Sequence, residues 1–172
     1  MNSRILLWMA AVLASGPCAS AFEASDLYGT WQLVSATRVI VATGVRTNAY
    51  GPAPKGYLTY GNDGRMSAII VDTTRSKPAD RAIITDGERA ALHKTMLAYA
   101  GTFSVEGSTV HHCVDISWNE SYTGTNQVRH ARLDGDTLYL TTNPRPITAD
   151  GKVSVGELKW VRLKSPPGPP GK

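Results

Sequence analysis

The stretch "GYLTYGNDGRMSAIIV", residues 56–71, decides the fold. It contains two short runs, Gly56 to Tyr60 and Arg65 to Val71, in which residue types that favour strands are common. Between the runs lies Asn62-Asp63-Gly64. Glycine and asparagine tolerate the positive φ angles of tight turns, so this segment predicts a β-hairpin.

The same pattern continues in both directions along the chain. Upstream, Thr30 to Val41 reads as one long strand, and "VRTNAYG" can return antiparallel to it. Downstream, alternating runs recur between turn signals: "AGTFSVEG", "STVHHCVDISW", "GTNQVRHARLDG", "DTLYLTTNP" and "ELKWVRLK". Consecutive hairpins leave exposed edges unless the sheet closes. The sequence therefore predicts an all-β fold, an up-and-down antiparallel barrel of about 8–9 strands.

One α-helix is predicted within this β pattern. Thr85 and Glu88 have the spacing of a capping box, in which each side chain caps the other's backbone N–H. Leu92, Met96 and Tyr99 then follow at spacings of four and three, which places them on one helical face. We expect the helix to span about 86–98.

The two ends of the chain are predicted to lie outside the barrel. Residues 1–21 combine Arg4, an apolar run and a final Ala-Ser-Ala, which is typical of a cleaved signal peptide. The apolar run is too short to span a bilayer, and Pro17 argues against acylation of Cys18. Residues 165–172 are rich in proline and glycine and are expected to be a disordered tail. The prediction is thus an exported protein, periplasmic or secreted, with one domain at 22–164.

Composition excludes several classes of protein. Net charge is +4, and the 18 basic residues are scattered rather than clustered, so we expect no nucleic-acid partner. The chain has two cysteines, and only Cys113 remains after the signal peptide. A disulfide scaffold is therefore excluded, and Cys113 is expected to be a small buried hydrophobic residue rather than a nucleophile. The sequence leaves the oligomeric state open.

Several segments together resemble the bacterial lipocalin-like domain family, a branch of the calycin barrels. The resemblance rests on the order and spacing of "LYGTWQLVSA", "GYLTYGNDGRMSA", "AYAGTFSVEGSTVHH", "GTNQVRHARLDGDTLYLTT" and "LKWVRL". It implies a small barrel, and it says little about chemistry. It also implies a structural pair that closes the barrel, with Arg162 stacked on the indole of Trp31.

"TVHHCVDIS", residues 109–117, places two histidines beside Cys113, a combination that suggests a metal site. Side chains alternate between the two faces of a strand. Val110, His112, Val114 and Ile116 are then expected inside the barrel, and His111 and Cys113 outside. This division prevents the trio from sharing one ion, so we expect no metal site.

The following strand suggests what the barrel interior holds. Gln127 and Arg129 share a face with Ala131 and Leu133, so we expect this face to be internal. Apolar pockets with a few convergent polar groups are typical ligand sites. The interpretation is a site for a small, largely apolar molecule with an acceptor group, without a cofactor. The expected ligand-binding residues are His112, Gln127, Arg129, Tyr57, Tyr60, Met66, Tyr99 and Phe103.

Three alternatives stay open at the level of sequence. The barrel interior can instead be filled with side chains, and the polar group of His112, Gln127 and Arg129 then only satisfies its own hydrogen bonds. The barrel can also be an enzyme of isomerase or cyclase type, with His112 as acid/base and Arg129 stabilising an oxyanion. No G-x-S-x-G, H-E-x-x-H or phosphate-binding loop supports catalysis. Finally, the proline-rich tail can be a ligand for another domain.

Overall fold

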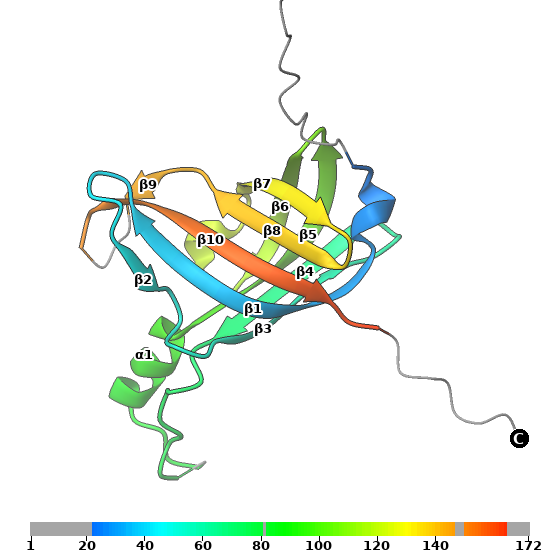
Figure 1. The fold of residues 1–172 in the computed structure, drawn as a ribbon. Helices are drawn as coiled ribbons and strands as arrows, with labels where there is room; N and C mark the ends of the chain where they lie inside the picture. Colours follow the sequence, from blue (N-terminus) through cyan, green and yellow to red (C-terminus); the bar gives the residue numbers. More distant parts are fainter. Residues whose placement is uncertain (1–21, 81, 147–149, 165–172) are drawn as a thin grey trace, which may run out of the picture.

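A computed structural model describes residues 22–80, 82–146 and 150–164 of the chain. These residues form one ten-stranded antiparallel sheet with the order β2-β1-β3-β4-β5-β6-β7-β8-β10-β9, and β1 also pairs with β10 (Figure 1). That last pairing closes eight of the strands into an up-and-down barrel. The barrel strands are β1 (Gly29–Ile40), β3 (Lys55–Tyr60), β4 (Arg65–Val71), β5 (Met96–Glu106), β6 (Thr109–Ser117), β7 (Asn126–Asp134), β8 (Thr137–Thr142) and β10 (Val153–Arg162). The predicted barrel is confirmed.

Two short strands lie at one end of the barrel. β2 (Arg46–Asn48) pairs with the second half of β1, and β9 (Arg145–Pro146) pairs with the start of β10. A 3-10 helix, η1 (Ala24–Leu27), lies at the opposite end (Figure 1). The two ends therefore differ, and this difference positions the site described below.

The barrel core follows the alternation of strand side chains. In the hairpin that opened the sequence analysis, Leu58, Tyr60, Met66, Ala68 and Ile70 are all buried. Gly64 has a φ of 78°, so the turn uses the glycine as expected. Burying this inner face supplies the hydrophobic free energy that holds the sheet closed.

Tyr57 does not belong to the interior. Its side chain is 49% exposed on the outer face, so the expectation that it lines the barrel is wrong. Tyr57 and Tyr60 are three residues apart in one strand, and residues an odd number apart point to opposite faces. Because Tyr60 faces inward, Tyr57 faces solvent.

The end of the barrel at η1 is closed by packing. Trp31 is fully buried, and its indole Nε1 donates to the Leu27 carbonyl at 2.8 Å. The guanidinium carbon of Arg162 lies 4.1 Å from the Trp31 ring centroid, and its N–H groups donate to the carbonyls of Asp26 and Tyr28. This arrangement ties η1 to the first and last strands of the barrel.

The α-helix is shorter than the sequence indicated. α1 spans Asp86–Lys94, and its capping box forms as expected. Thr95 ends the helix, since its hydroxyl donates to the carbonyls of Ala91 and Leu92. The 86–98 boundary is wrong because the next residues join β5, where Tyr99 pairs with a residue of β4. Burial of the Tyr99 side chain in the barrel outweighs one further helical turn.

A β-bulge changes the alternation at the end of β6. The register against β5 shifts between Ala100 and Gly101, so Val114 pairs with Gly101 while Ile116 pairs with Ala100. As a result Ile116 is 64% exposed, and the expectation that it points inward is wrong. Cys113 is also exposed, so it is not a buried hydrophobic residue.

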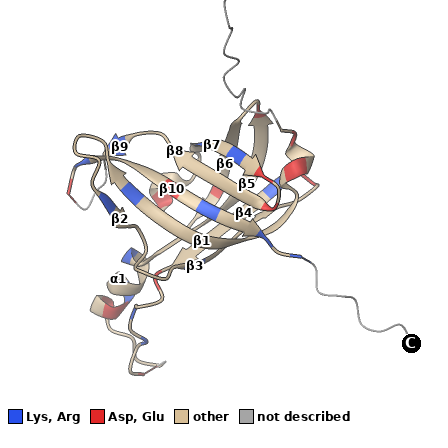
Figure 2. Cartoon of the chain, in the orientation of Figure 1, with Lys and Arg blue, Asp and Glu red and all other residues tan. Residues whose placement is uncertain are grey.

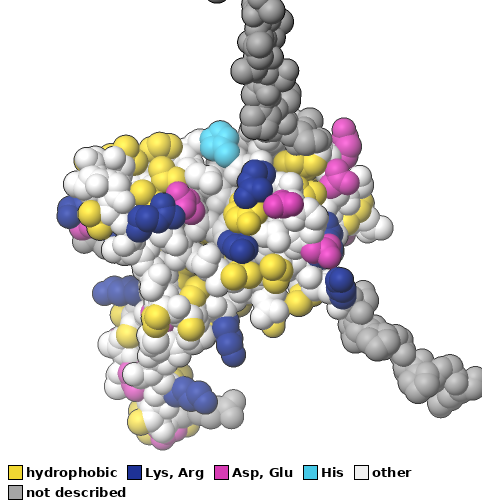
Figure 3. All heavy atoms as spheres, in the orientation of Figure 1, with side chains coloured by type: hydrophobic (Ala, Val, Ile, Leu, Met, Phe, Trp, Pro, Cys, Tyr) yellow, Lys and Arg dark blue, Asp and Glu magenta, His cyan; other side chains and the backbone are white. Residues whose placement is uncertain are grey.

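The outer surface carries both signs of charge. Figure 2 shows basic and acidic residues at interspersed positions along the chain, and in Figure 3 their side chains lie near one another on the face in view. Arg38 pairs with Asp150 at 2.6 Å, and Arg65 pairs with Asp115 at 2.7 Å. No helix among the described residues is long and apolar enough to cross a membrane. The predicted signal peptide and the predicted tail lie outside the described residues.

Candidate functional site

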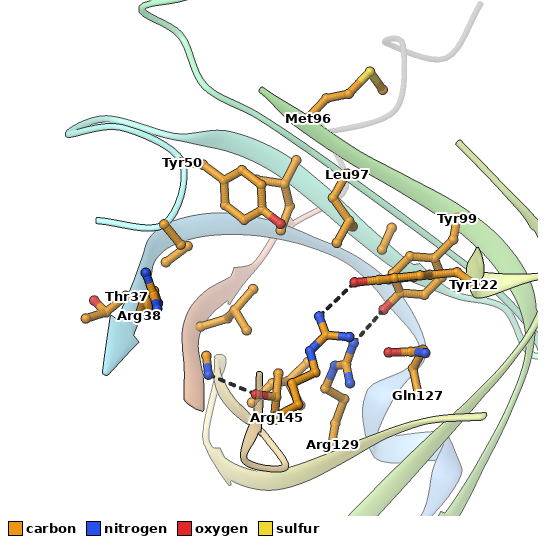
Figure 4. Close-up of a pocket in the computed structure, with 18 of the residues that line it drawn as sticks. Thr37, Arg38, Tyr50, Met96, Leu97, Tyr99, Tyr122, Gln127, Arg129 and Arg145 are labelled. Carbon is orange, nitrogen blue, oxygen red and sulfur yellow. Dashed lines mark hydrogen bonds between the residues drawn. The ribbon is translucent and has the colours of Figure 1, made fainter. Parts of the chain in front are cut away.

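A cavity of about 710 Å³ opens at the end of the barrel that carries β2 and β9. Its lining comes from all eight barrel strands, from both short strands, from the end of α1, and from the connection between β6 and β7, which contains the 3-10 helix η2 (Glu120–Tyr122). Figure 4 shows its polar side chains converging from several of these elements. A volume of this size suits a small organic ligand.

The inner wall of the cavity is apolar. It is formed by residues of β3, β4, β5, β8 and β10, namely Leu58, Ala68, Ile70, Leu97, Leu140 and Leu158. Trp160 also lines this wall and is buried, and its indole Nε1 has no hydrogen-bond partner within the described part of the chain. A buried donor without a partner is costly, so this N–H is available to an acceptor that enters the cavity.

His112 is held between two tyrosines. It is 1% exposed, and its Nε2 lies 2.7 Å from the Tyr60 hydroxyl while its Nδ1 lies 2.9 Å from the Tyr99 hydroxyl. Burial, with a further contribution from the nearby Arg129 charge, holds the pKa of His112 well below its ordinary value of 6.5. The imidazole is therefore neutral near pH 7, and both ring nitrogens are already occupied.

Arg129 is a buried cation without a carboxylate partner in the described ranges. Its side chain is 8% exposed, one guanidinium nitrogen donates to the Val128 carbonyl at 2.8 Å, and the other lies 3.5 Å from the Tyr99 hydroxyl. Both of these partners are neutral. A buried charge is usually paired, so a negative group inside the cavity would stabilise this arrangement.

A second arginine faces the cavity from its rim. Arg145 of β9 donates to the Tyr122 hydroxyl of η2 at 2.7 Å (Figure 4). Tyr50 lies nearby, and burial raises the pKa of its hydroxyl to about 12. The sequence analysis missed Arg145, Tyr122 and Tyr50, because all three lie in rim segments where side-chain alternation does not predict direction. No sequence signal identifies them.

The cavity is strongly positive. Arg38, Lys94, Arg129 and Arg145 all line it, and no aspartate or glutamate does so among the residues that the structure describes. Of these four, only Arg38 has a carboxylate partner within the described ranges, namely Asp150. Low-dielectric walls concentrate the field of such charges, so the cavity favours an anion over a cation.

The residues expected at the site divide into three groups. His112, Gln127, Arg129 and Tyr99 line the cavity. Tyr60, Met66 and Phe103 pack in the closed half of the barrel, where the Tyr60 and Phe103 ring centroids are 4.6 Å apart. Tyr57 lies outside. The interior is therefore partly filled and partly open, a combination that neither the pocket interpretation nor the filled-barrel alternative anticipated.

The histidines do not converge on one ligand position. His112 is inside the barrel, while His111 faces outward and contacts Asn126 at 3.0 Å. His130, which is exposed, contacts Asn143 at 2.7 Å. No cluster of three or more histidine, cysteine, aspartate or glutamate residues suited to a metal occurs in the described ranges.

A closed, eight-stranded, up-and-down barrel with a cavity at one end is an architecture that fits small-molecule binding. The family model described as a lipocalin-like domain matches residues 28–163, which is most of the chain. The protein therefore belongs to the lipocalin-like domain family. No curated protein matches the chain significantly.

Proposed function

We propose that the protein binds a small amphipathic molecule, with its apolar body against the inner wall and an anionic or acceptor head group beside Arg129. The observation that carries this proposal is a buried guanidinium in a cavity whose described lining contains no carboxylate. An anionic head group supplies the missing charge through charge-assisted hydrogen bonds. The leucines and Ile70 of the wall contribute binding free energy in proportion to the apolar area they bury.

The arrangement of His112 supports binding rather than direct acid–base catalysis by this residue. A general base must accept a proton from a ligand at hydrogen-bond distance. Both ring nitrogens of His112 instead face tyrosine hydroxyls. The groups that a ligand can contact instead include the Tyr99 hydroxyl, Arg129 and the Trp160 indole.

Export is part of the proposal. We propose that residues 1–21 are removed as a signal peptide, that residues 22–164 act as the mature binding domain, and that the protein works in the periplasm or outside the cell. The support is the sequence pattern of Arg4, an apolar run and the final Ala-Ser-Ala. N-terminal sequencing of exported protein should give Phe22 as the first residue. A lipid-modified start at Cys18 would disprove this assignment.

Two fluorescent probes test the binding function. Anilinonaphthalene sulfonate carries an apolar ring system and one negative charge, and N-phenylnaphthylamine has the same ring system without the charge. Both should bind saturably at one site per barrel, and the charged probe should bind more tightly. If neither probe binds, the proposed binding cavity is wrong. If the neutral probe binds as tightly as the charged one, the proposed preference for an anion is wrong.

A further inference from the structure

The Tyr60 hydroxyl fixes the direction of a hydrogen-bond chain. It is buried, and among the described residues its hydroxyl contacts only the Nε2 of His112, at 2.7 Å. A buried hydroxyl proton without an acceptor is costly. Tyr60 therefore donates its proton to Nε2, and Nε2 acts as an acceptor.

The single proton of the neutral imidazole is then on Nδ1. A neutral histidine has one donor and one acceptor nitrogen. Since Nε2 accepts, Nδ1–H donates to the Tyr99 hydroxyl oxygen at 2.9 Å. The opposite tautomer would leave the Tyr60 proton buried without an acceptor in the described part of the protein.

The Tyr99 hydroxyl proton consequently has no acceptor within the described structure. The Tyr99 oxygen receives Nδ1–H and faces a guanidinium N–H of Arg129 at 3.5 Å, and no other partner contacts it. Tyr99 lines the cavity. Its proton therefore points into the cavity, and the Nδ1–H donor on its oxygen makes it a stronger donor in turn.

We propose that the Tyr99 hydroxyl and Arg129 form an oxyanion site that binds the acidic hydroxyl of a phenol or enol as its anion. This inference rests on the proposed function and specifies the head group. His112 is a positioning residue, since it acts only by orienting the Tyr99 proton. Lys94 and Arg145 also line the cavity, and both of these charges favour an anion.

The geometry favours a single anionic oxygen over a carboxylate. A carboxylate is bound best by the open fork of an arginine, with two parallel N–H donors. In Arg129 one terminal nitrogen is engaged by the Val128 carbonyl and the other faces Tyr99. The site thus offers one O–H beside a partly occupied guanidinium, and this pair of donors suits a single phenolate or enolate oxygen.

p-Nitrophenol tests this site, because its ionised and neutral forms absorb at different wavelengths. Full-length protein should bind the phenolate at least about tenfold more tightly than the neutral phenol, which lowers the pKa of the bound phenol by about one unit. Tyr99→Phe should remove most of this preference. Tyr57→Phe, an exposed tyrosine on the outer face, is the matched control and should not change it.

The outcomes separate this inference from the proposed function. If N-phenylnaphthylamine binds while p-nitrophenol shows no shift or does not bind, the oxyanion site is wrong and the binding cavity stands. If no probe enters the barrel, both are wrong. An unchanged preference in Tyr99→Phe would also overturn the inference, provided that the variant still binds N-phenylnaphthylamine.

The histidine tautomer gives an independent measurement. The chain has four histidines, so the ¹⁵N signals of their rings can be assigned by single substitutions. His112 should show a protonated Nδ1 and an unprotonated Nε2 at pH 7. A protonated Nε2 would reverse the hydrogen-bond chain, direct the Tyr99 proton toward His112, and overturn the inference.

Discussion

Replacement of Arg129 by methionine should separate the role of this residue in binding from any role in stability. Methionine retains most of the apolar stem and removes the buried charge. The lost hydrogen bond to the Val128 carbonyl, 2.8 Å long, stabilises by about 1.5–3 kcal/mol, while the contact to Tyr99 at 3.5 Å is at the limit of a hydrogen bond. The same substitution removes the desolvation penalty of an unpaired buried ion, which is several kcal/mol.

The two effects nearly cancel, so the free energy of unfolding of Arg129→Met should stay within about 1 kcal/mol of the wild-type value or exceed it. Binding should respond differently. Loss of the cation should weaken binding of anilinonaphthalene sulfonate by about 2 kcal/mol or more, which is about thirtyfold. Binding of N-phenylnaphthylamine should change little, because that probe has no charge.

Urea denaturation followed by tryptophan fluorescence measures the free energy of unfolding, and fluorescence titration measures the affinity for each probe. Arg132→Met is the matched control, since Arg132 lies on the same strand and is exposed. Its guanidinium lies 3.5 Å from Asp134 and stacks on the Tyr139 ring, 3.9 Å from the centroid. Arg132→Met should leave probe binding unchanged and alter stability by less than about 1 kcal/mol. A loss of about 3 kcal/mol in Arg129→Met, without any probe uptake, would refute the reasoning and make the polar group purely structural.

Three further predictions concern the barrel itself. Trp31→Ala should destabilise the protein by about 3–5 kcal/mol, and Arg162→Ala by less. Because the two side chains touch, urea denaturation of the double variant should show non-additive losses, whereas additive losses would mean no coupling. Because the pKa of His112 is depressed in the folded state, only the unfolded state binds its proton just below pH 6.5, and the free energy of unfolding should fall on acidification by up to about 1.36 kcal/mol per pH unit. Urea titrations down to about pH 5 should show a smaller dependence of this free energy on pH in His112→Gln, and an equal slope would contradict the prediction. Gly101→Ala would place a Cβ 2.0 Å from a backbone carbonyl oxygen of β6, so the melting temperature of this variant should be clearly lower than that of the wild type. An unchanged melting temperature would show that the backbone at the bulge moves easily.

Local signals in the sequence predicted the features that depend on local chemistry. The turn at Asn62-Asp63-Gly64 and the capping box of Thr85 and Glu88 formed as expected, because each depends on a few adjacent residues. Strand alternation likewise predicted that His112 and Arg129 point inward.

Features that depend on pairing between distant segments were not predictable in this way. The bulge opposite Gly101 turned Ile116 outward, and nothing in the sequence of β6 alone reveals it. The spacing of Met96 and Tyr99 fits one face of a helix, and only pairing with β4 places both residues in a strand. Arg145 reaches the cavity from a two-residue strand at the rim, where no periodic pattern exists.

The most direct test of the central claim is a crystal structure of the protein with bound anilinonaphthalene sulfonate. The account predicts the ring system inside the barrel against Leu97 and Leu158, with a sulfonate oxygen at hydrogen-bond distance from Arg129. A probe bound only on the outer surface would contradict the account, as would a probe inside the barrel with its sulfonate directed away from Arg129.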